Sequence, residues 1–479
     1  MAEASVVMKR AQHADALISR DFERLNLVDR YARGYHRAPY VPRKSNPEFK
    51  DLVKRSITNV MPLVIDTPAN ALRVEGYRRS GQEKNAPEWE WWQKNRLDDR
   101  QAAVHRAALA DGIAYVVVTP DPRRGKRAPV VRAFPAINTV AVYQDPTADE
   151  FPLYALHVPK HDQDSGEHRI GVLWDDVAEY TVDFDAPGGS KVVKTVPHGL
   201  GVCPVVQFTP GRDLHGRALG VVEPLIVVQD KLNQQVLSLL LAEHWGAHAI
   251  RFGTGLAPTE RLDEFGDPIT DEKTGEILYD VPTLDPSTLL MAPNADAKFG
   301  QLPAMPTADL RADIDQTMQS VCAISQTPPH YLMADMVNLS ADALVAAESA
   351  FQRRLTAIQD SFGEAWESVL RLIARIAGSA GTDDESGQVT WADKGNRSLA
   401  QAADALTKLM QQGVPLAVAL RKVPGFSQAD VDESVKAAEE AARKAETAER
   451  RAMSDGVGSA GGRDGGSERG VRPGSSQDR

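Results

Sequence analysis

A long apolar stripe in the C-terminal half sets the strictest limit on how this chain can fold. Its members recur at gaps of three, four and seven residues and are Leu344, Phe351, Leu355, Ile358, Phe362, Trp366, Leu370, Ile373 and Ile376. This spacing predicts one amphipathic helix of more than thirty residues that ends near Gly378. Directly before the stripe lies the aperiodic segment 327–340, where two prolines break any earlier helix and Ser340 is typical of an N-cap. We therefore expect a loop between two helices.

The composition indicates a protein of several domains. The chain has 479 residues, of which 42% are apolar, so about two to four domains with sizeable cores are expected. The net charge of −11 argues against a general nucleic-acid binder, which would carry a basic excess. Cys203 and Cys322 are the only cysteines, too few for a disulfide framework or a thiolate metal site.

Neither a signal peptide nor a membrane span is expected. The N-terminus lacks a long apolar core and is typical of an amphipathic helix. The most apolar segment, residues 221–242, contains the charged residues Glu223, Asp230 and Lys231. The sequence therefore predicts a soluble protein of cytoplasmic origin.

Residues 1–219 show the mixed pattern of an α+β domain. The expected elements are helices to about residue 35 and over 47–72, a strand at 73–78, a helix from 97 and strands up to 208. Trp89 and Trp92 fall on one face of a short helix, which indicates burial in a core.

A basic turn interrupts this domain. It contains Arg123, Arg124, Lys126 and Arg127, which could hold a phosphate group. A solvated hairpin tip explains the same composition and is the favoured interpretation.

From residue 220 the pattern becomes that of a long helix, expected to reach about residue 247. Its apolar residues cover more than half of the circumference, including Leu232, Val236, Leu237 and Leu240. The flanking sequence offers few partner helices. We therefore expect this helix to pack against copies of itself in a ring.

A non-helical insertion, residues 250–303, follows this helix. It is expected to contain a β-hairpin that turns at 273–275. Its acidic residues could suggest calcium, but the spacing of an EF-hand is missing, so a solvated acidic turn is favoured. A second helix, residues 307–325, carries Asp309, Asp313 and Asp315 against a single Arg311.

Beyond Gly378 the sequence predicts a polar linker, a short strand with Trp391 and two helices within residues 397–450. Residues 454–479 consist of glycine, serine and charged residues with almost nothing apolar. This tail is expected to be disordered.

Catalytic motifs are absent from the sequence. No phosphate-binding loop, HExxH, CxxC or GxSxG is present. His244 and His248 lie one helical turn apart but lack an obvious third ligand, so a metal site is not favoured. His330 could act as a base, yet no nucleophile or acid accompanies it in sequence. We predict a protein that is not an enzyme and holds no metal or cofactor.

The order of the parts and three local sequences resemble the portal proteins of tailed bacteriophages, in particular those of siphophages. The three sequences are RYARGYHRAPYVP, GRALGVVEPLIVVQDKLN and TPPHYLMADMVNLSADAL. The resemblance covers about residues 15 to 450, in order, and leaves out the tail.

This resemblance implies an α+β fold with an α/β wing, a two-helix stem, a small β-rich clip, a long wing helix and a helical crown. Carried onto this chain, the parts are a wing (1–219), stem helices (220–249 and 304–325), a clip (250–303), a channel loop (326–340), a long helix with a return to the wing (341–395), a crown (396–452) and a tail (453–479).

The resemblance also implies a function in packaging and ejection of double-stranded DNA. The copies would form a ring, about twelve of them, at one capsid vertex. Implied partners are the large terminase subunit, a head–tail connector or adaptor, and the major capsid and scaffolding proteins, with no membrane. The protein would reside in the virion, and in the host cytoplasm during assembly.

Three groups of site residues follow from combining the pattern with the resemblance. The channel loop would present His330, Met333, Met336 and Asn338 to DNA, although the two methionines and the asparagine could instead pack on the neighbouring subunit. Asp309, Asp313 and Asp315 would form an acidic channel wall that does not grip a polyanion, unless they face solvent outside the ring. Leu232, Val236, Leu237 and Leu240 would join the stem helices of neighbouring copies.

Two other classes stay open at this point. One is another phage structural protein, such as a head-morphogenesis or adaptor protein. The second is a helical enzyme with an unrecognised site.

Overall fold

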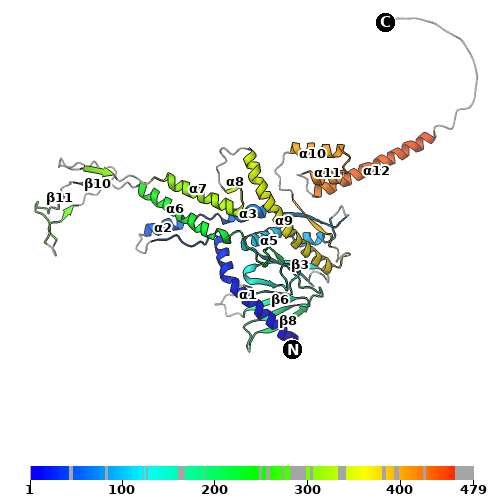
Figure 1. Cartoon of the computed structure of the whole chain (residues 1–479), viewed down its shortest axis with the longest axis horizontal. Helices are drawn as coiled ribbons and strands as arrows, with labels where there is room; N and C mark the ends of the chain where they lie inside the picture. Colours follow the sequence, from blue (N-terminus) through cyan, green and yellow to red (C-terminus); the bar gives the residue numbers. More distant parts are fainter. Residues whose placement is uncertain are drawn as a thin grey trace, which may run out of the picture. The chain divides into compact units, whose positions relative to one another are not determined.

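The computed structural model describes the chain from residue 2 to residue 458 with several gaps. The described residues are 2–41, 47–80, 85–121, 123, 125, 128–159, 168–187, 189–247, 251–254, 259–271, 275–280, 298–301, 306–332, 341–379, 385–392, 399–423 and 428–458. Figure 1 shows the elements coloured along the sequence. The chain divides into two compact units. The first unit comprises Met1–Asn70, Ala103–Val117 and Arg132–Phe362, and the second comprises Ala71–Ala102, Val118–Val131 and Gly363–Arg479.

A five-stranded antiparallel meander forms one end of the first unit. Its strands follow chain order, β4 (Thr139–Val142), β5 (Tyr154–His157), β6 (Ile170–Asp175), β7 (Ala178–Asp183) and β8 (Lys191–Pro197). The first helix, α1 (Ala2–Ala32), packs one apolar stripe on this sheet, with Val7, Ala11 and Ala14 buried among sheet residues. The stripe has helical spacing, so burial on the sheet rather than propensity explains why this long helix is stable.

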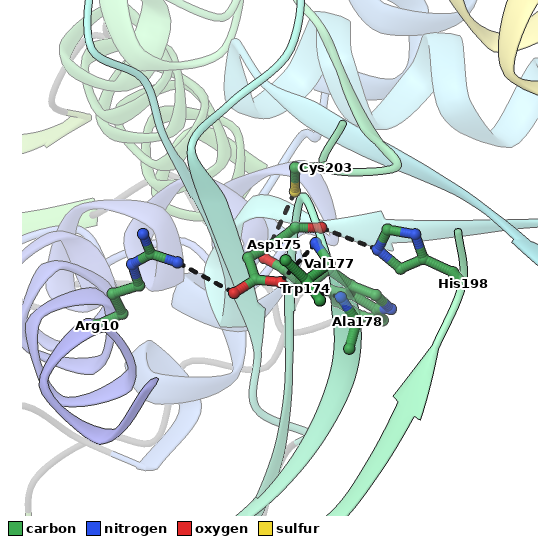
Figure 2. Close-up of polar contacts among 7 residues, drawn as sticks. All are labelled: Arg10, Trp174, Asp175, Val177, Ala178, His198 and Cys203. Atoms are coloured by element: carbon green, nitrogen blue, oxygen red, sulfur yellow. Dashed lines mark hydrogen bonds and ion pairs between the residues drawn. The ribbon is translucent and has the colours of Figure 1, made fainter. Parts of the chain in front are cut away.

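Asp175 at the end of β6 ties α1 to the sheet (Figure 2). One carboxylate oxygen accepts from Arg10 at 3.0 Å, and the other accepts from the backbone N–H groups of Val177 and Ala178 at 2.9 and 3.0 Å. The Asp175 carbonyl oxygen accepts from His198 Nε2 at 2.9 Å, so the other ring nitrogen is free to accept from a backbone N–H. Because Asp175 is buried, these partners stabilise a charge that would otherwise be costly.

A second sheet has the order β3-β2-β9. Its strands are β2 (Ala114–Pro120), β3 (Pro129–Pro135) and β9 (Val205–Phe208). In the first unit, residues 114–117 of β2 pair antiparallel with β9. The β-branched run predicted as a strand after Gly112 is thus confirmed, and it is buried along nearly its whole length.

Two glycines join this sheet to the α6 region. Helix α5 (Leu97–Asp111) ends at Gly112, whose φ of +87° is the left-handed conformation that favours glycine. A Cβ atom on Gly220 would overlap the carbonyl oxygen of Ala110, and one on Gly112 would lie 2.8 Å from the Gly220 nitrogen. The backbone N–H of Val221 donates to the Leu109 carbonyl at 2.8 Å. Only two residues without side chains permit this approach.

The predicted helix over 47–72 is wrong, since two helices form there. These are α2 (Pro47–Arg55) and α3 (Met61–Ala71). The backbone N–H groups of Thr58 and Val60 donate to side chains of α6 (Ile226–Ala247), namely Asn233 and Gln229, instead of continuing a helix. Tertiary hydrogen bonds therefore overrode the local helical pattern.

The β-rich insertion consists of two-stranded pairs among the residues described. β10 (Arg251–Thr254) pairs with β13 (Lys298–Gln301), and β11 (Thr259–Glu260) pairs with β12 (Tyr279–Asp280). The non-helical character predicted for 250–303 is confirmed there. Of the predicted turn, residues 273 and 274 lie outside the described residues, and Gly275 has the positive φ of a turn.

The second unit contains a two-stranded sheet of β1 (Val74–Arg78) and β14 (Gln388–Trp391), both predicted as strands. The short helix α4 (Trp89–Lys94) stacks Trp89 on Trp92 with ring centroids 4.9 Å apart. Trp92 is fully buried and contacts Trp366 edge to face. Burial of this aromatic face is confirmed.

The C-terminal prediction needs two corrections. Three helices follow β14 rather than two, α10 (Leu399–Gln411), α11 (Leu416–Lys422) and α12 (Gln428–Gly458). The additional helix, α11, starts directly after Pro415. The sequence pattern predicted a break between two helices at this proline, although proline is also favoured at helix starts. α12 extends past residue 454, and the rest of the predicted tail lies outside the described residues.

Candidate functional site: the α6–α7 pair and the segment before α9

Helices α6 and α7 (Ala308–Ser325) pack side by side at the junction with α1 and α3 (Figure 1). Their shared cluster buries Leu232 of α6 and Val321 of α7 together with residues of three other elements, Tyr31, Val60, Met61, Val64, Ile65, Val222 and Leu225. Both helices were predicted. The bounds of α7 agree with the prediction within one residue, whereas α6 begins six residues later than predicted, after a 3-10 turn over Glu223–Leu225.

The prediction that α6 needs other copies to cover its apolar surface is only partly supported. Leu232 and Leu237 are each 1% exposed within the single chain. Val236 and Leu240 are half-buried. The residues that share a cluster with Leu232 come mainly from α1, α3 and Val60, with Val321 of α7. The sequence pattern did not predict α1 and α3, which are distant in sequence, as partners of α6. Leu232 and Leu237 therefore stabilise the protomer, and the predicted contact between copies through residues of α6 stays a prediction.

A buried polar network holds α6 against the segment that follows α1. Gln229 and Asn233 are fully buried, and Gln229 donates both to the Thr58 carbonyl at 2.7 Å and to Asn233 at 3.0 Å. Asn233 in turn donates to His36 Nδ1 at 3.0 Å, while His36 Nε2 donates to the Tyr31 carbonyl at 3.1 Å. Burial lowers the pKa of His36, which keeps the ring neutral as this arrangement requires.

Tyr31 closes this network on the other side. Its hydroxyl donates to Asp230 at 2.5 Å, and its ring stacks on His36 with centroids 4.9 Å apart. Burial and the Asp230 carboxylate raise the pKa of Tyr31 to about 12. No charge-relay or nucleophile results from this arrangement, so we interpret it as a structural network.

All three predicted acidic residues of α7 are exposed in the protomer. Asp309 and Asp313 are one turn apart and share a side of the helix, whereas Asp315 lies about 200° around the axis from Asp313. The three therefore cannot all face one channel. The exposed side between them carries Ala312, Gln316, Gln319 and Ala323, which are small or uncharged.

Helix α7 ends in a strained turn. Gln326 has a φ of +51°, and the N–H of Thr327 donates to the Cys322 carbonyl at 3.0 Å. The predicted loop 327–340 contains a short helix that the sequence pattern did not predict, α8 (Pro329–Leu332). It starts on a proline, as helices often do. Met333, Met336 and Asn338 lie outside the described residues, so their predicted role stays a prediction.

His330 is fixed by a residue that the sequence reading did not pair with it. Its Nε2 donates to the carboxylate of Glu348 at 2.9 Å, on helix α9 (Ala341–Ala377). The neighbouring Tyr331 contacts Phe351 of the same helix, with ring centroids 5.8 Å apart. Together these contacts fasten α8 to α9. Within the described part of the chain, the side-chain partners of His330 are Glu348 and Tyr331.

Arg354 of α9 lies at the junction with the end of α7. It donates to the Ser325 carbonyl, and burial lowers its pKa. The side chain borders two neighbouring open cavities of about 610 and 640 Å³. Both cavities also share Gln326, so the strained turn forms part of their walls.

The weaker predicted sites find no support among the described residues. Arg123 pairs with Asp121 at 3.1 Å in an exposed turn, while Arg124, Lys126 and Arg127 lie outside the described residues, as does His248. In the insertion, Asp263 accepts from the N–H groups of Phe265 and Asp267, which makes it a turn residue. Within the described ranges no three potential metal ligands gather, and no helix is long and apolar enough to cross a membrane.

Comparison with known proteins identifies the family of this chain. The profile of the family described as "Phage portal protein, SPP1 Gp6-like" matches residues 14–450. The chain belongs to this portal family. The match spans both compact units, most of α1 and α12, and all of the elements between these two helices.

Two curated relatives agree with the family. The portal protein of Mycobacterium phage L5 is 30% identical over 366 residues, which is 73% of this chain and 72% of the relative. The portal protein of Mycobacterium phage D29 is 30% identical over 388 residues, or 78% of this chain and 76% of the relative. A chain of a solved structure titled "Virion of native gene transfer agent (GTA) particle" is 11% identical with a TM-score of 0.39, covering 81% of this chain and 94% of that one, and this likeness carries no weight here.

Family membership makes the protein a structural component of a phage capsid, with a portal function. The expected mixed α+β fold is confirmed as a combination of helices and antiparallel sheets.

Proposed function

We propose that copies of this chain form a closed ring, about twelve of them, at one capsid vertex, and that double-stranded DNA enters and leaves through the central channel. The observation that carries the proposal is the family match over residues 14–450, which leaves out only the two ends of the chain. The absence of a phosphate-binding loop in the sequence supports a passive role, in which a separate ATPase drives the DNA.

In this proposal each described element has a place. Helices α6 and α7 form the stem, the insertion 250–303 forms the clip, and residues 326–340 form the channel loop. The wing comprises 1–219 and 341–395, the crown 396–452 and the tail 453–479. The large terminase subunit and later a head–tail connector dock at the clip, and the major capsid and scaffolding proteins surround the wing. Assembly takes place in the host cytoplasm.

The charge distribution supports free passage of DNA. Tight binding to phosphate groups would add affinity and therefore friction, since each neutralised phosphate strengthens binding. The chain has a net charge of −11, and the exposed side of α7 between Asp313 and Asp315 carries small or uncharged residues. An acidic or uncharged wall lets a polyanion slide.

Native mass spectrometry and electron microscopy of the purified chain test the proposal. We expect a large closed ring with a central channel. A stable monomer at high protein concentration would contradict the proposed ring. Hydrolysis of a nucleotide by the isolated chain, abolished by one point substitution, would favour an enzyme instead.

A further inference from the structure

An exposed aromatic and basic surface lies beside α6 and has no role in the function proposed above. It contains Tyr35 and Tyr40, which are 65% and 79% exposed, and the exposed side chains of Arg37 and Lys231. We call these four residues the tyrosine platform. Tyrosine and arginine are enriched in protein–protein contacts, where they supply large contact areas at low entropic cost.

The platform is held in place from below. His36, between two of its members, is buried and bonded to Asn233 and to the Tyr31 carbonyl. The backbone N–H of Tyr40 donates to Gln234 of α6 at 3.0 Å. A surface loop whose backbone is fixed in this way loses little conformational entropy when a partner binds.

The platform and the acidic residues of α7 lie on different sides of the α6–α7 pair. On α6, Leu232 and Val236 belong to the cluster shared with Val321 of α7, whereas Gln234, beside Tyr40, points about 180° away from the middle of these two residues. On α7, Ile314, Met318 and Val321 pack toward α6, and Asp309 and Asp313 lie to one side of them, exposed. The pair thus presents a basic surface and an acidic surface in different directions.

The two surfaces also lie at the same level along the helices. Gln235 donates to the Asp313 carbonyl at 3.3 Å, and its neighbour Gln234 accepts from Tyr40. In a ring with rotational symmetry, surfaces at one level on different sides of each copy can meet without a shift along the axis.

We propose that the tyrosine platform of one copy docks on Asp309 and Asp313 of the next copy. The proposal rests on the ring described under the proposed function and names the surfaces that close it. Charge complementarity selects a second copy's α7, and pairing of two platforms face to face would bring like charges together. The contact is heterologous, as ring formation requires. It also assigns Asp309 and Asp313 to the subunit boundary and leaves Asp315, on the other side of α7, for the channel wall.

Paired charge reversals test this contact. The full-length variants are Arg37→Glu with Lys231→Glu, and Asp309→Lys with Asp313→Lys. Each variant alone has two surfaces of the same sign, so we expect its ring population in native mass spectrometry to fall at least tenfold. An equimolar mixture restores both pairings, and we expect rings in which the two variants alternate.

The matched control for the Arg37 and Lys231 reversal is Lys191→Glu with Lys194→Glu, two exposed positions of β8, which changes the net charge by the same amount as that reversal. It should assemble as the unmodified chain does. If a reversed variant melts below the unmodified chain in circular dichroism, Arg37→Gln with Lys231→Gln replaces it, and a ring population equal to the control's would overturn the proposal.

Other outcomes also decide the matter. Normal rings from either reversed variant alone, or no rescue in the mixture, would overturn the proposal while the ring itself stands. Normal rings that lose affinity for a double-stranded DNA duplex would reassign the platform to DNA. Absence of rings from the unmodified chain would remove the proposed function as well.

Discussion

Gln326 holds a backbone conformation that glycine adopts more readily. Its φ of +51° lies in the left-handed region, directly after the last residue of α7. We expect Gln326→Gly to leave stability unchanged or to raise it by up to about 1 kcal/mol, since relief of strain offsets the entropy of glycine. Chemical denaturation of the protomer measures the change.

The exposed helical residue Gln316 provides the control for this substitution. Gln316→Gly should destabilise by about 1 kcal/mol, as glycine does within helices. Equal losses at both positions would show that Gln326 is not strained in solution.

Asp111 makes stability depend on pH. Burial, with a smaller contribution from Asp29, raises its pKa to about 7 from 3.8. Between these values the folded chain binds a proton that the unfolded chain does not, so this contribution to stability is present below pH 4 and is lost as the pH rises through 7. We expect Asp111→Asn to stabilise the protomer above pH 7, by at most about 4 kcal/mol, and to have little effect near pH 4.

Denaturation curves at pH 5 and pH 8 compare Asp111→Asn with the unmodified chain. The exposed Asp176 serves as a control, since Asp176→Asn should shift neither curve. An equal effect of Asp111→Asn at both pH values would argue against a raised pKa.

Single residues also show how far sequence alone reaches. His330 is identifiable as part of a loop that begins with two prolines and precedes a long helix. Its partner Glu348 is not, because the eight residues between α8 and α9 carry no pattern that predicts how the chain turns. The tyrosine platform could not be predicted for a similar reason. The exposure of Tyr35 beside a buried His36 depends on the contacts of His36 with α6.

Among the elements, helices with strong periodicity were predictable and their surroundings were not. The apolar circumference of α6 indicated burial, but periodicity cannot tell whether the cover comes from the same chain or another copy. The structure supplies most of it from α1, the residues before α3 and α7. The break between α2 and α3 was equally hidden, since it follows from hydrogen bonds to Gln229 and Asn233.

The attachment of α8 to α9 leads to a prediction for the element as a whole. Glu348→Ala removes the acceptor of His330, at a cost of about 1 kcal/mol or roughly fivefold in local opening. Hydrogen exchange of residues 329–332 should become faster by that factor. Glu348→Gln retains an acceptor and should exchange nearly as slowly as the unmodified chain, and Asp360→Ala, at an exposed position of α9, should have no effect.

At the scale of the whole assembly, salt should weaken the ring. The proposed contact joins exposed Arg37 and Lys231 to exposed aspartates, and 1 M salt reduces the Debye length to about 3 Å. We expect the temperature at which rings dissociate to fall between 50 mM and 1 M NaCl. Native mass spectrometry after heating measures this, and Arg37→Gln with Lys231→Gln should abolish the dependence. A salt response that survives this substitution would place the sensitive charges elsewhere.

The close approach of Gly112 and Gly220 bears on how the assembled protein carries load. In the ring proposed above, DNA moving under pressure would exert force along the channel, and a stem helix would pass that force to whatever its end is bonded to. Here the residues that lead into α6 are bonded, through Val221 and Leu109, to the end of α5, and only Gly112 and Ile113 separate α5 from the start of β2. Because no side chain separates the two backbones, no side-chain rearrangement can absorb a displacement of α6 relative to α5. The contact between these two backbone segments is therefore rigid. In the proposed ring, an alanine at either glycine would weaken this contact even where the protomer still folds.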